Sequence, residues 1–331
     1  MRLFQDKFSI YKKAGEPLYK TPKSVQECIE ILKVAPDGIF EVAGNRYSKS
    51  YLFSDVNYNT TSETEQVGIF ESYCKFLNAM DVEFKITINN KNRNMKTLRE
   101  KVLFQKKGDG NDAERDCYNQ IMERKIVEGK QGIEQERYLT VSIIRKNYEE
   151  AKAAFASLEA VLQKGFGELG SSLVTLDGVE RLRVLHDFYR MGEEEYFSFD
   201  FDEAVRVSRD YKDDICNSML KFSPTYMQDE KRFAKALFIK KYPSSLSDRF
   251  LTELATVPAH TIISIDVAPI PKDVTTSTLQ KKYMGIESDI IRQQRVRNKN
   301  NDFSSDISYN KRTEKQQIEE IMDDVRENDQ R

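Results

Sequence analysis

The feature that most constrains the fold of this chain is an internal repeat of predicted elements. Each run consists of a strand, a helix, a second strand and further helices, as judged from the spacing of apolar residues. The two runs are Tyr47–Val56, Ser62–Met80, Val82–Asn89 and Asn111–Gly129, and then Arg232–Lys240, Ser245–Thr256, Thr261–Val267 and the helices through Val325. This order predicts an α+β fold of two related strand–helix–strand units, in which helices cover mixed sheets.

The N-terminal run closes with a further strand, Arg137–Ile144, for which the C-terminal run has no equivalent. A unit without its last strand leaves backbone groups unpaired and an apolar face uncovered. We therefore expect the second unit to lack its last strand, and the chain to be the front part of a longer protein.

These patterns divide the chain into four consecutive parts. We expect a flexible tail at residues 1–22, a first α/β unit at 23–169, a connector or insertion at 170–230 and a second, truncated α/β unit at 231–331. The repeat does not explain the connector, which carries a helical pattern at Val179–Tyr189.

The composition excludes several classes of protein. The chain has 331 residues, of which 39% are hydrophobic and 32% charged, so it is long enough for two cores. No apolar run approaches the ~20 residues of a membrane span, and the start lacks the apolar stretch of a secretory signal. We therefore expect a cytoplasmic protein. A net charge of −2 argues against a dedicated nucleic-acid binder.

The residue types that support most metal and nucleophile chemistry are scarce. There are four cysteines and two histidines. The cysteines are scattered without a Cys-x-x-Cys pair, so we expect no disulfide framework and no metal site. The residues are Cys28, Cys74, Cys117, Cys216, His186 and His260.

The glycines do not form a phosphate loop. No Gly-x-x-x-x-Gly-Lys-Ser/Thr occurs, so we expect no cofactor in this chain and no ATP turnover by it. The run Gly165–Gly170 matches Gly-x-Gly-x-x-Gly, but it follows a helix, whereas a dinucleotide site needs a preceding strand. We interpret it as a helix C-cap followed by a loop.

Two regions of the connector could carry chemistry. His186 and Asp187 suggest a general base with its orienting carboxylate, although neighbours on a helix point about 100° apart and cannot readily hydrogen-bond. No nucleophile accompanies them, so a structural polar network is the favoured interpretation. The acidic run Glu193–Asp202 could hold a divalent cation, but adjacent glutamates are more often solvated. Its alternating aromatics, Tyr196–Phe201, could form an edge strand that docks a partner. An ordinary strand packed on the domain is the favoured interpretation.

Two basic stretches could contact phosphate or anionic lipid, although intervening acidic residues favour a solvated surface. They are Lys91, Arg93, Lys96, Arg99, Lys101, Lys106 and Lys107, and then Arg292, Arg295, Arg297 and Lys299.

Five short sequence motifs, which we call words, occur together and in the same order in one family. They are Pro36–Val42 (PDGIFEV), Tyr47–Tyr58 (YSKSYLFSDVNY), Ile86–Asn90 (ITINN), Leu176–Arg190 (LDGVERLRVLHDFYR) and Ser264–Pro271 (SIDVAPIP). The chain resembles the N-terminal half of the conjugative-transfer ATPases of Gram-positive mobile elements, in the TrbE/CagE class of type IV secretion ATPases. Met191 and Asp214 depart from the family pattern, which expects Pro and an aromatic residue there.

The resemblance implies a downstream motor domain that holds ATP and Mg, so no catalytic, cofactor-binding or metal-binding residue of the family maps onto this chain. It also implies a hexamer of the full-length protein at the cytoplasmic face of the cell membrane. The expected partners are small inner-membrane subunits of the secretion complex and a coupling protein; direct binding of nucleic acid is not expected.

The sequence thus predicts a non-catalytic docking and assembly domain of a secretion ATPase. Two alternatives remain from other classes: a stand-alone enzyme that uses His186, Asp187 and the run Glu193–Asp202, and a nucleic-acid-binding protein that uses the basic stretches.

Overall fold

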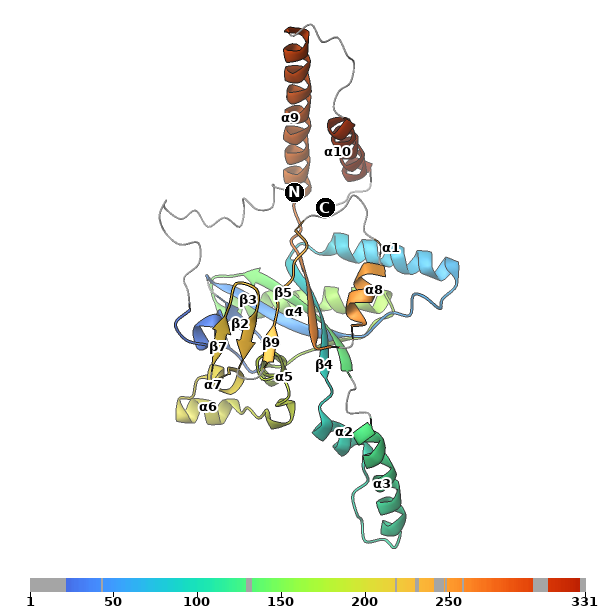
Figure 1. The fold of residues 1–331 in the computed structure, drawn as a ribbon, viewed down its shortest axis with the longest axis vertical. Helices are drawn as coiled ribbons and strands as arrows, with labels where there is room; N and C mark the ends of the chain where they lie inside the picture. The colour runs from blue at the N-terminus through green and yellow to red at the C-terminus, as the bar shows by residue number, and fades with distance from the viewer. Residues whose placement is uncertain are drawn as a thin grey trace. The chain divides into compact units, whose positions relative to one another are not determined.

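A computed structural model describes residues 22–42, 44–128, 133–217, 219–229, 232–240, 247, 249–257, 259–299 and 309–327. Helices flank antiparallel strands in it, which confirms the predicted α+β class (Figure 1). The tail expected at residues 1–22 lies outside the described residues, apart from residue 22.

The chain divides into two compact units, each assembled from three separate segments. Unit 1 comprises Met1–Asn45, Asn90–Gln135 and Leu176–Thr261, and unit 2 comprises Arg46–Asn89, Glu136–Thr175 and Ile262–Arg331. The sequence favours consecutive units instead, because periodicity along a chain does not reveal which distant segments pack together.

Unit 2 is built on a sheet with the strand order β3–β5–β4–β10, and the short strand β6 also pairs with β3. β3 and β5 are antiparallel, with Arg46 opposite Ile144 and Phe53 opposite Arg137. The strands are β3 (Arg46–Phe53), β4 (Glu83–Asn92), β5 (Ile133–Ile144), β6 (Leu173–Thr175) and β10 (Thr261–Val267), and the ends of β4, β5 and β10 belong to unit 1.

Two helices of unit 2, α1 (Glu63–Ala79) and α4 (Tyr148–Glu168), pack on each other. The ring of Phe166 on α4 lies 5.2 Å from the ring of Phe76 on α1 and 5.3 Å from that of Phe53 on β3. Lys49 on β3 forms a 2.8 Å ion pair with Glu159 on α4. A side chain as large as Phe166 contributes about 1.5–3 kcal/mol when it leaves water, so these contacts hold the helices to the strand.

A pair of antiparallel helices, α9 (Lys272–Lys299) and α10 (Tyr309–Glu327), completes unit 2; the two lie side by side (Figure 1). Ile286 on α9 and Ile318 on α10 are buried. Lys315 reaches Glu287 at 2.9 Å across the pair. One apolar stripe on each helix is therefore used for pairing, as the helical periodicity predicts.

Unit 1 contains the β1–β2 hairpin, a three-stranded antiparallel sheet in the order β7–β8–β9, and several short helices. Its core joins residues from both ends of the unit, including Phe40, Leu182 and Ile215. The strands are β1 (Ile31–Val34), β2 (Phe40–Val42), β7 (Leu220–Phe222), β8 (Met227–Asp229) and β9 (Arg232–Ala234). The helices are η1 (Gln26–Cys28), α2 (Met95–Val102), α3 (Asp112–Glu128), α5 (Gly178–Tyr189), η2 (Glu194–Tyr196), α6 (Phe201–Val207), α7 (Tyr211–Ile215) and α8 (Arg249–Ala255).

The two runs of the sequence repeat do not have the same strand pairing. In the first run, β3 and β4 belong to one sheet, with β5 between them. In the second run, β9 ends at Ala234 and pairs with β8 in the separate three-stranded sheet, whereas β10 follows β4. The runs Tyr47–Asn89 and Arg232–Val267, which the sequence predicts as related strand–helix–strand units, therefore differ in their strand pairing, because tertiary partners rather than local pattern decide which sheet a strand joins.

Among the residues that the structure describes, none of the helices combines the length and apolar character that crossing a bilayer requires.

Candidate functional site: a buried charge cluster in unit 1

His186 and Asp187, the pair that the sequence offers as a general base, are both buried on α5. Their exposed fractions are 3% each. His186 Nδ1 lies 3.5 Å from Asp187 Oδ1, at the outer limit of a hydrogen bond. The two neighbours thus approach each other more closely than the expectation from helix geometry allows. The imidazole also packs on the ring of Phe197, with 5.0 Å between the centroids.

The second oxygen of Asp187 accepts a hydrogen bond from a lysine that the sequence places on a solvated basic stretch. Lys91 Nζ lies 3.2 Å from Asp187 Oδ2, and Lys91 is 9% exposed. Lys91 stands near the end of β4, so the ion pair fixes this strand end to α5 within unit 1. The expectation that this lysine is solvated at the surface is therefore wrong. A lysine side chain can be buried with its charge when a buried carboxylate forms an ion pair with it.

The acidic run Glu193–Asp202 does not gather its carboxylates in one place. Glu194 points inward and accepts a 2.7 Å hydrogen bond from the backbone of Gly192. Glu193 contacts Arg190, and Asp200 caps α6 by accepting from the backbone of Asp202 and Glu203. Among the described residues no group of His, Cys, Asp or Glu could hold a metal ion.

The aromatic part of this run also differs from the expected strand. Glu194–Tyr196 forms a 3₁₀ turn, and α6 begins at Phe201. Tyr196 is exposed, whereas Phe199 is buried and lies 5.0 Å from the ring of Phe201. Both interpretations that require a strand at Tyr196–Phe201 are wrong, although the packing of Phe199 on the domain is present. Capping by Asp200 starts a helix where alternation alone predicts a strand.

The second histidine joins the same cluster from the turn before β10. Burial lowers the pKa of His260, while the carboxylates of Glu194 and Asp187 act in the opposite direction and the cations Arg232 and Lys91 lower it further. Its Nε2 atom is buried without a hydrogen-bond partner. The side chain of Arg232 lies against Gly192, where an added Cβ would be 3.2 Å from the guanidinium.

The cluster is electrically balanced when both histidines are neutral. Lys91 and Arg232 contribute two positive charges, and Asp187 and Glu194 contribute two negative charges. The Asn94 side chain donates to the backbone carbonyl of Glu194 at 3.0 Å and so extends the network to the start of α2. Such an arrangement joins chain segments of unit 1, and a substrate atom cannot reach the His186 ring without displacing them.

Two thiols of this unit, those of Cys28 and Cys216, are not activated nucleophiles. Burial raises the pKa of Cys216 to about 11, and burial also raises the pKa of Cys28. Only a small fraction of either thiol is ionised near neutral pH, and the thiolate is the reactive form.

The run Gly165–Gly170 lies at the C-terminal end of α4, and Gly170 has a φ of +75° beyond the helix. The interpretation as a C-cap and loop is confirmed. Gly165 has a further role that the sequence does not reveal: a Cβ there would be 2.5 Å from the Phe76 ring, so its absence allows α1 and α4 to approach.

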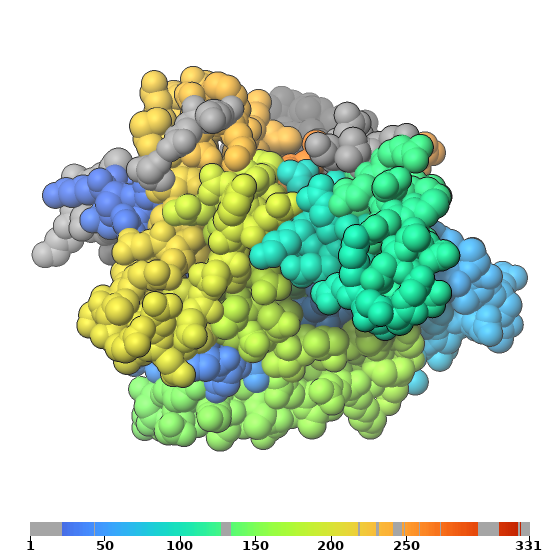
Figure 2. Space-filling model, turned by 90° about the horizontal axis from the view of Figure 1, so that it is seen from below, coloured from blue at the N-terminus to red at the C-terminus, as the bar shows by residue number. Residues whose placement is uncertain are grey.

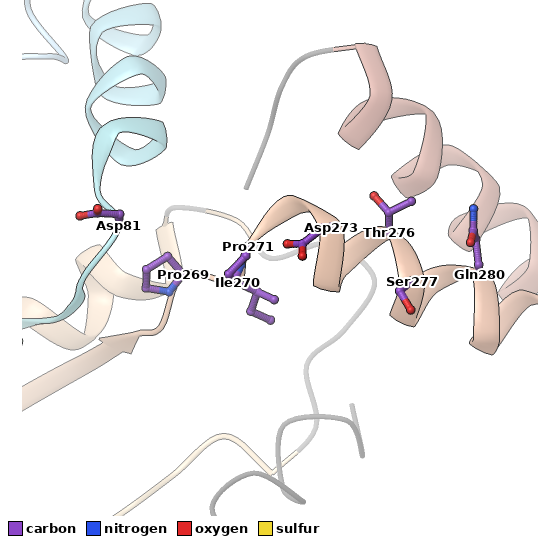
Figure 3. A pocket seen from close by; sticks show the side chains of 8 residues that line it. All are labelled: Asp81, Pro269, Ile270, Pro271, Asp273, Thr276, Ser277 and Gln280. Carbon is purple, nitrogen blue, oxygen red and sulfur yellow. The ribbon is translucent and has the colours of Figure 1, made fainter. Parts of the chain in front are cut away.

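A cavity of about 820 Å³ opens in unit 2 where α9 begins (Figure 3). It lies beside Pro269, Ile270 and Pro271, and the carboxylates of Asp81 and Asp273 are on its wall. Among the lining residues that the structure describes, the ionisable side chains are those two carboxylates.

Comparison with known proteins gives no independent identification. No protein-family model matches the chain, and no match was found among curated proteins.

Proposed function

We propose that this chain is the N-terminal docking and assembly region of a conjugative type IV secretion ATPase of the TrbE/CagE class, and that it is non-catalytic by itself. The full-length protein would be a homo-oligomer at the cytoplasmic face of the membrane and would bind small inner-membrane subunits and a coupling protein. ATP and Mg would be bound by a downstream motor domain.

One observation carries this proposal: two of the words that establish the resemblance interlock in unit 1. Arg181, in the word Leu176–Arg190, donates a 2.7 Å hydrogen bond to the carbonyl of Gly38. Its guanidinium lies 3.9 Å from the centroid of the Phe40 ring, in the word Pro36–Val42. Residues that carry the resemblance thus make contacts that join two distant segments of unit 1.

The glycines of the two words support the same interpretation. Gly38 has a φ of +79°, and a Cβ there would be 2.1 Å from the carbonyl oxygen of Leu176. A Cβ at Gly178 would be 2.3 Å from the carbonyl oxygen of Ala35, and the backbone of Gly178 donates to Pro36 at 2.9 Å. Gly38 is required because the backbone of the other word comes so close, and Gly178 because the backbone of Ala35, directly before the word Pro36–Val42, does. A likeness located at such contacts supports the proposed family architecture.

The two alternatives have less support. A stand-alone enzyme would need an accessible base, whereas His186 is 3% exposed and Asp187 is already paired with Lys91. A nucleic-acid binder would use the basic stretch that begins at Lys91, and this residue is buried. In the same stretch Arg99 is paired with Glu123 and Lys106 with Asp116.

The test is reconstitution with the small membrane subunits of a Gram-positive conjugation system in detergent. The purified chain should form a stoichiometric complex with at least one subunit, and it should not hydrolyse ATP above the background of a contaminant-free sample. The variant Gly38→Val should disrupt the contact between the two words, and it should therefore reduce complex formation. Absence of any complex, together with measurable ATP turnover, would overturn the proposal.

A further inference from the structure

The helix α9 has an exposed face on the side away from α10, which we call the outer face of α9. Its positions recur at three- and four-residue intervals, so at about 100° per residue they fall on one side of the helix. All six of its side chains are exposed: Lys281, Met284, Ser288, Ile291, Arg292 and Arg295. Ile286, the buried residue of the stripe that pairs with α10, lies on the opposite side.

The carboxylates in this part of α9 are paired with lysines of α10. Glu287 lies 2.9 Å from Lys315, and Asp289 lies 3.0 Å from Lys311. Both carboxylates therefore serve the contact between the two helices. The six residues of the outer face, by contrast, include three cations and no carboxylate.

The cations of the outer face keep most of their charge for another partner. Lys281 and Arg295 have no ion-pair partner among the residues that the structure describes. Arg292 reaches Asp289 at 3.2 Å, but 77% of its side chain is exposed, so water weakens this pair. The basic character continues to the end of the helix, because residues 290–299 contain no acidic residue.

The other basic stretch of the sequence differs in this respect. Figure 2 shows α2 and α3 (teal to green), which carry most of it, at the molecular surface. There Arg99 pairs with Glu123 at 3.3 Å, and Lys106 pairs with Asp116 at 2.8 Å. Unpaired cations, rather than exposure alone, therefore distinguish the outer face of α9.

Apolar side chains stand between the cations of the outer face. Met284 is 60% exposed and Ile291 is 47% exposed, and the two lie seven residues apart on the same line of the helix. A helix face that combines Lys and Arg with exposed apolar groups is typical of a helix that lies in a membrane interface, where lipid phosphates attract the cations and the acyl boundary accepts the apolar groups.

Other occupants fit this face less well. A partner helix needs apolar residues at successive contact positions, whereas Lys281, Ser288 and Arg295 interrupt the line of Met284 and Ile291. A second copy of the face would bring like charges together. Nucleic acid would use the cations through its phosphates but would leave the apolar side chains in water.

We propose that the outer face of α9 binds an anionic lipid surface, with the helix lying along it. The cations reach the lipid phosphates, and Met284 and Ile291 enter the headgroup region between them. Each cation near such a surface strengthens binding about fivefold, so one copy binds weakly and several copies in one assembly bind together. The inference rests on the proposed location at a membrane and names the surface that makes the contact.

The first experiment is flotation of the purified chain with vesicles of phosphatidylglycerol and phosphatidylcholine in equal parts. Wild-type protein should bind these vesicles but not vesicles of phosphatidylcholine alone, and added salt should weaken the binding. The variant Lys281→Gln/Arg295→Gln should lower the partition coefficient about 25-fold, at about fivefold for each cation.

The matched control is Arg99→Gln/Lys106→Gln, which removes the same number of positive charges from the paired stretch and should leave the partition coefficient unchanged. Circular dichroism checks that both variants are folded. Absence of wild-type binding to the anionic vesicles, or an equal loss in both double variants, would overturn the proposal.

The second experiment distinguishes lipid from nucleic acid. Met284→Ser/Ile291→Ser keeps every charge and should weaken binding to the anionic vesicles severalfold, because the apolar contribution is lost. Fluorescence anisotropy with a random-sequence DNA duplex provides the comparison. Duplex binding that Lys281→Gln/Arg295→Gln abolishes and Met284→Ser/Ile291→Ser retains, without vesicle binding, would assign the face to nucleic acid and overturn the proposal.

These outcomes are separate from those of the reconstitution with membrane subunits. A chain that forms the subunit complex but does not bind vesicles would overturn the lipid contact and leave the proposed function in place. A chain that binds vesicles through α9 but forms no subunit complex would support the lipid contact and count against the docking role.

Discussion

Lys91 Nζ lies 3.2 Å from Asp187 Oδ2, and both side chains are buried in unit 1. An ion pair of this kind is costly to break from one side, because the remaining charge has no water to solvate it. The exposed pair Lys85–Asp266 has the same separation, 3.2 Å, and provides a natural comparison.

Replacing Lys91 with Met should lower the free energy of unfolding by about 3–5 kcal/mol, because Asp187 is left buried and unpaired. Lys85→Met should cost only about 0–1 kcal/mol, since water screens the exposed pair. Denaturant titrations monitored by circular dichroism measure both values. The double variant Lys91→Met/Asp187→Leu should recover most of the loss; equal destabilisation by the two single lysine variants would contradict a buried role.

The stability of the chain should decrease in acid through His260. Burial lowers the folded-state pKa of His260 below its ordinary value of about 6.5. The unfolded chain therefore binds a proton in a pH range where the folded chain does not, and the free energy of unfolding falls as the pH drops from about 6.5 towards the lower folded-state pKa. Above that range this contribution is fully present.

His260→Gln removes the titrating group and should flatten the pH dependence in this window. Denaturant midpoints measured at a series of pH values provide the readout. The Lys85→Met variant should keep the slope of the wild type, because its surface pair lies outside the cluster. A His260→Gln variant with an unchanged slope would show that another group is responsible.

Gly165→Ala should destabilise unit 2 by about 1–3 kcal/mol, because the new methyl group overlaps the Phe76 ring in a packed interior. Gly167→Ala is the matched control on the same helix: no atom lies within 4 Å of the added Cβ. It should raise stability by about 0.5–1 kcal/mol through helix propensity. Thermal unfolding should show opposite shifts for the two variants, and shifts in the same direction would contradict the close approach.

Tyr211→Phe should lower stability by about 0.5–1.5 kcal/mol. The Tyr211 hydroxyl donates a 2.5 Å hydrogen bond to the carbonyl of Ile31 within the core of unit 1, and burial raises its pKa. Tyr196→Phe removes a hydroxyl from a side chain that is 79% exposed and should change stability little. Comparable losses for both variants in denaturant titrations would argue against the buried bond.

The sequence by itself determined the elements whose causes lie within a few residues. Ser62 and Glu65 form a capping box at the start of α1, and Asn147 caps α4 by accepting from the backbone of Glu150. The spacing of apolar residues predicts α5 at Val179–Tyr189, one residue from its observed start. Such features depend on neighbours three or four positions away, so a linear pattern records them.

Only the tertiary structure decided how distant segments combine. The sequence offers His186 and Asp187 as a site but contains no local sign that Lys91 and His260 join them, because these contacts link segments far apart in the chain. The sequence also contained no sign that β9 ends at Ala234, since a strand requires pairing partners as well as strand propensity. Charge burial and strand pairing depend on neighbours in three dimensions. For this reason the two runs have similar sequence patterns, but their strands join different sheets.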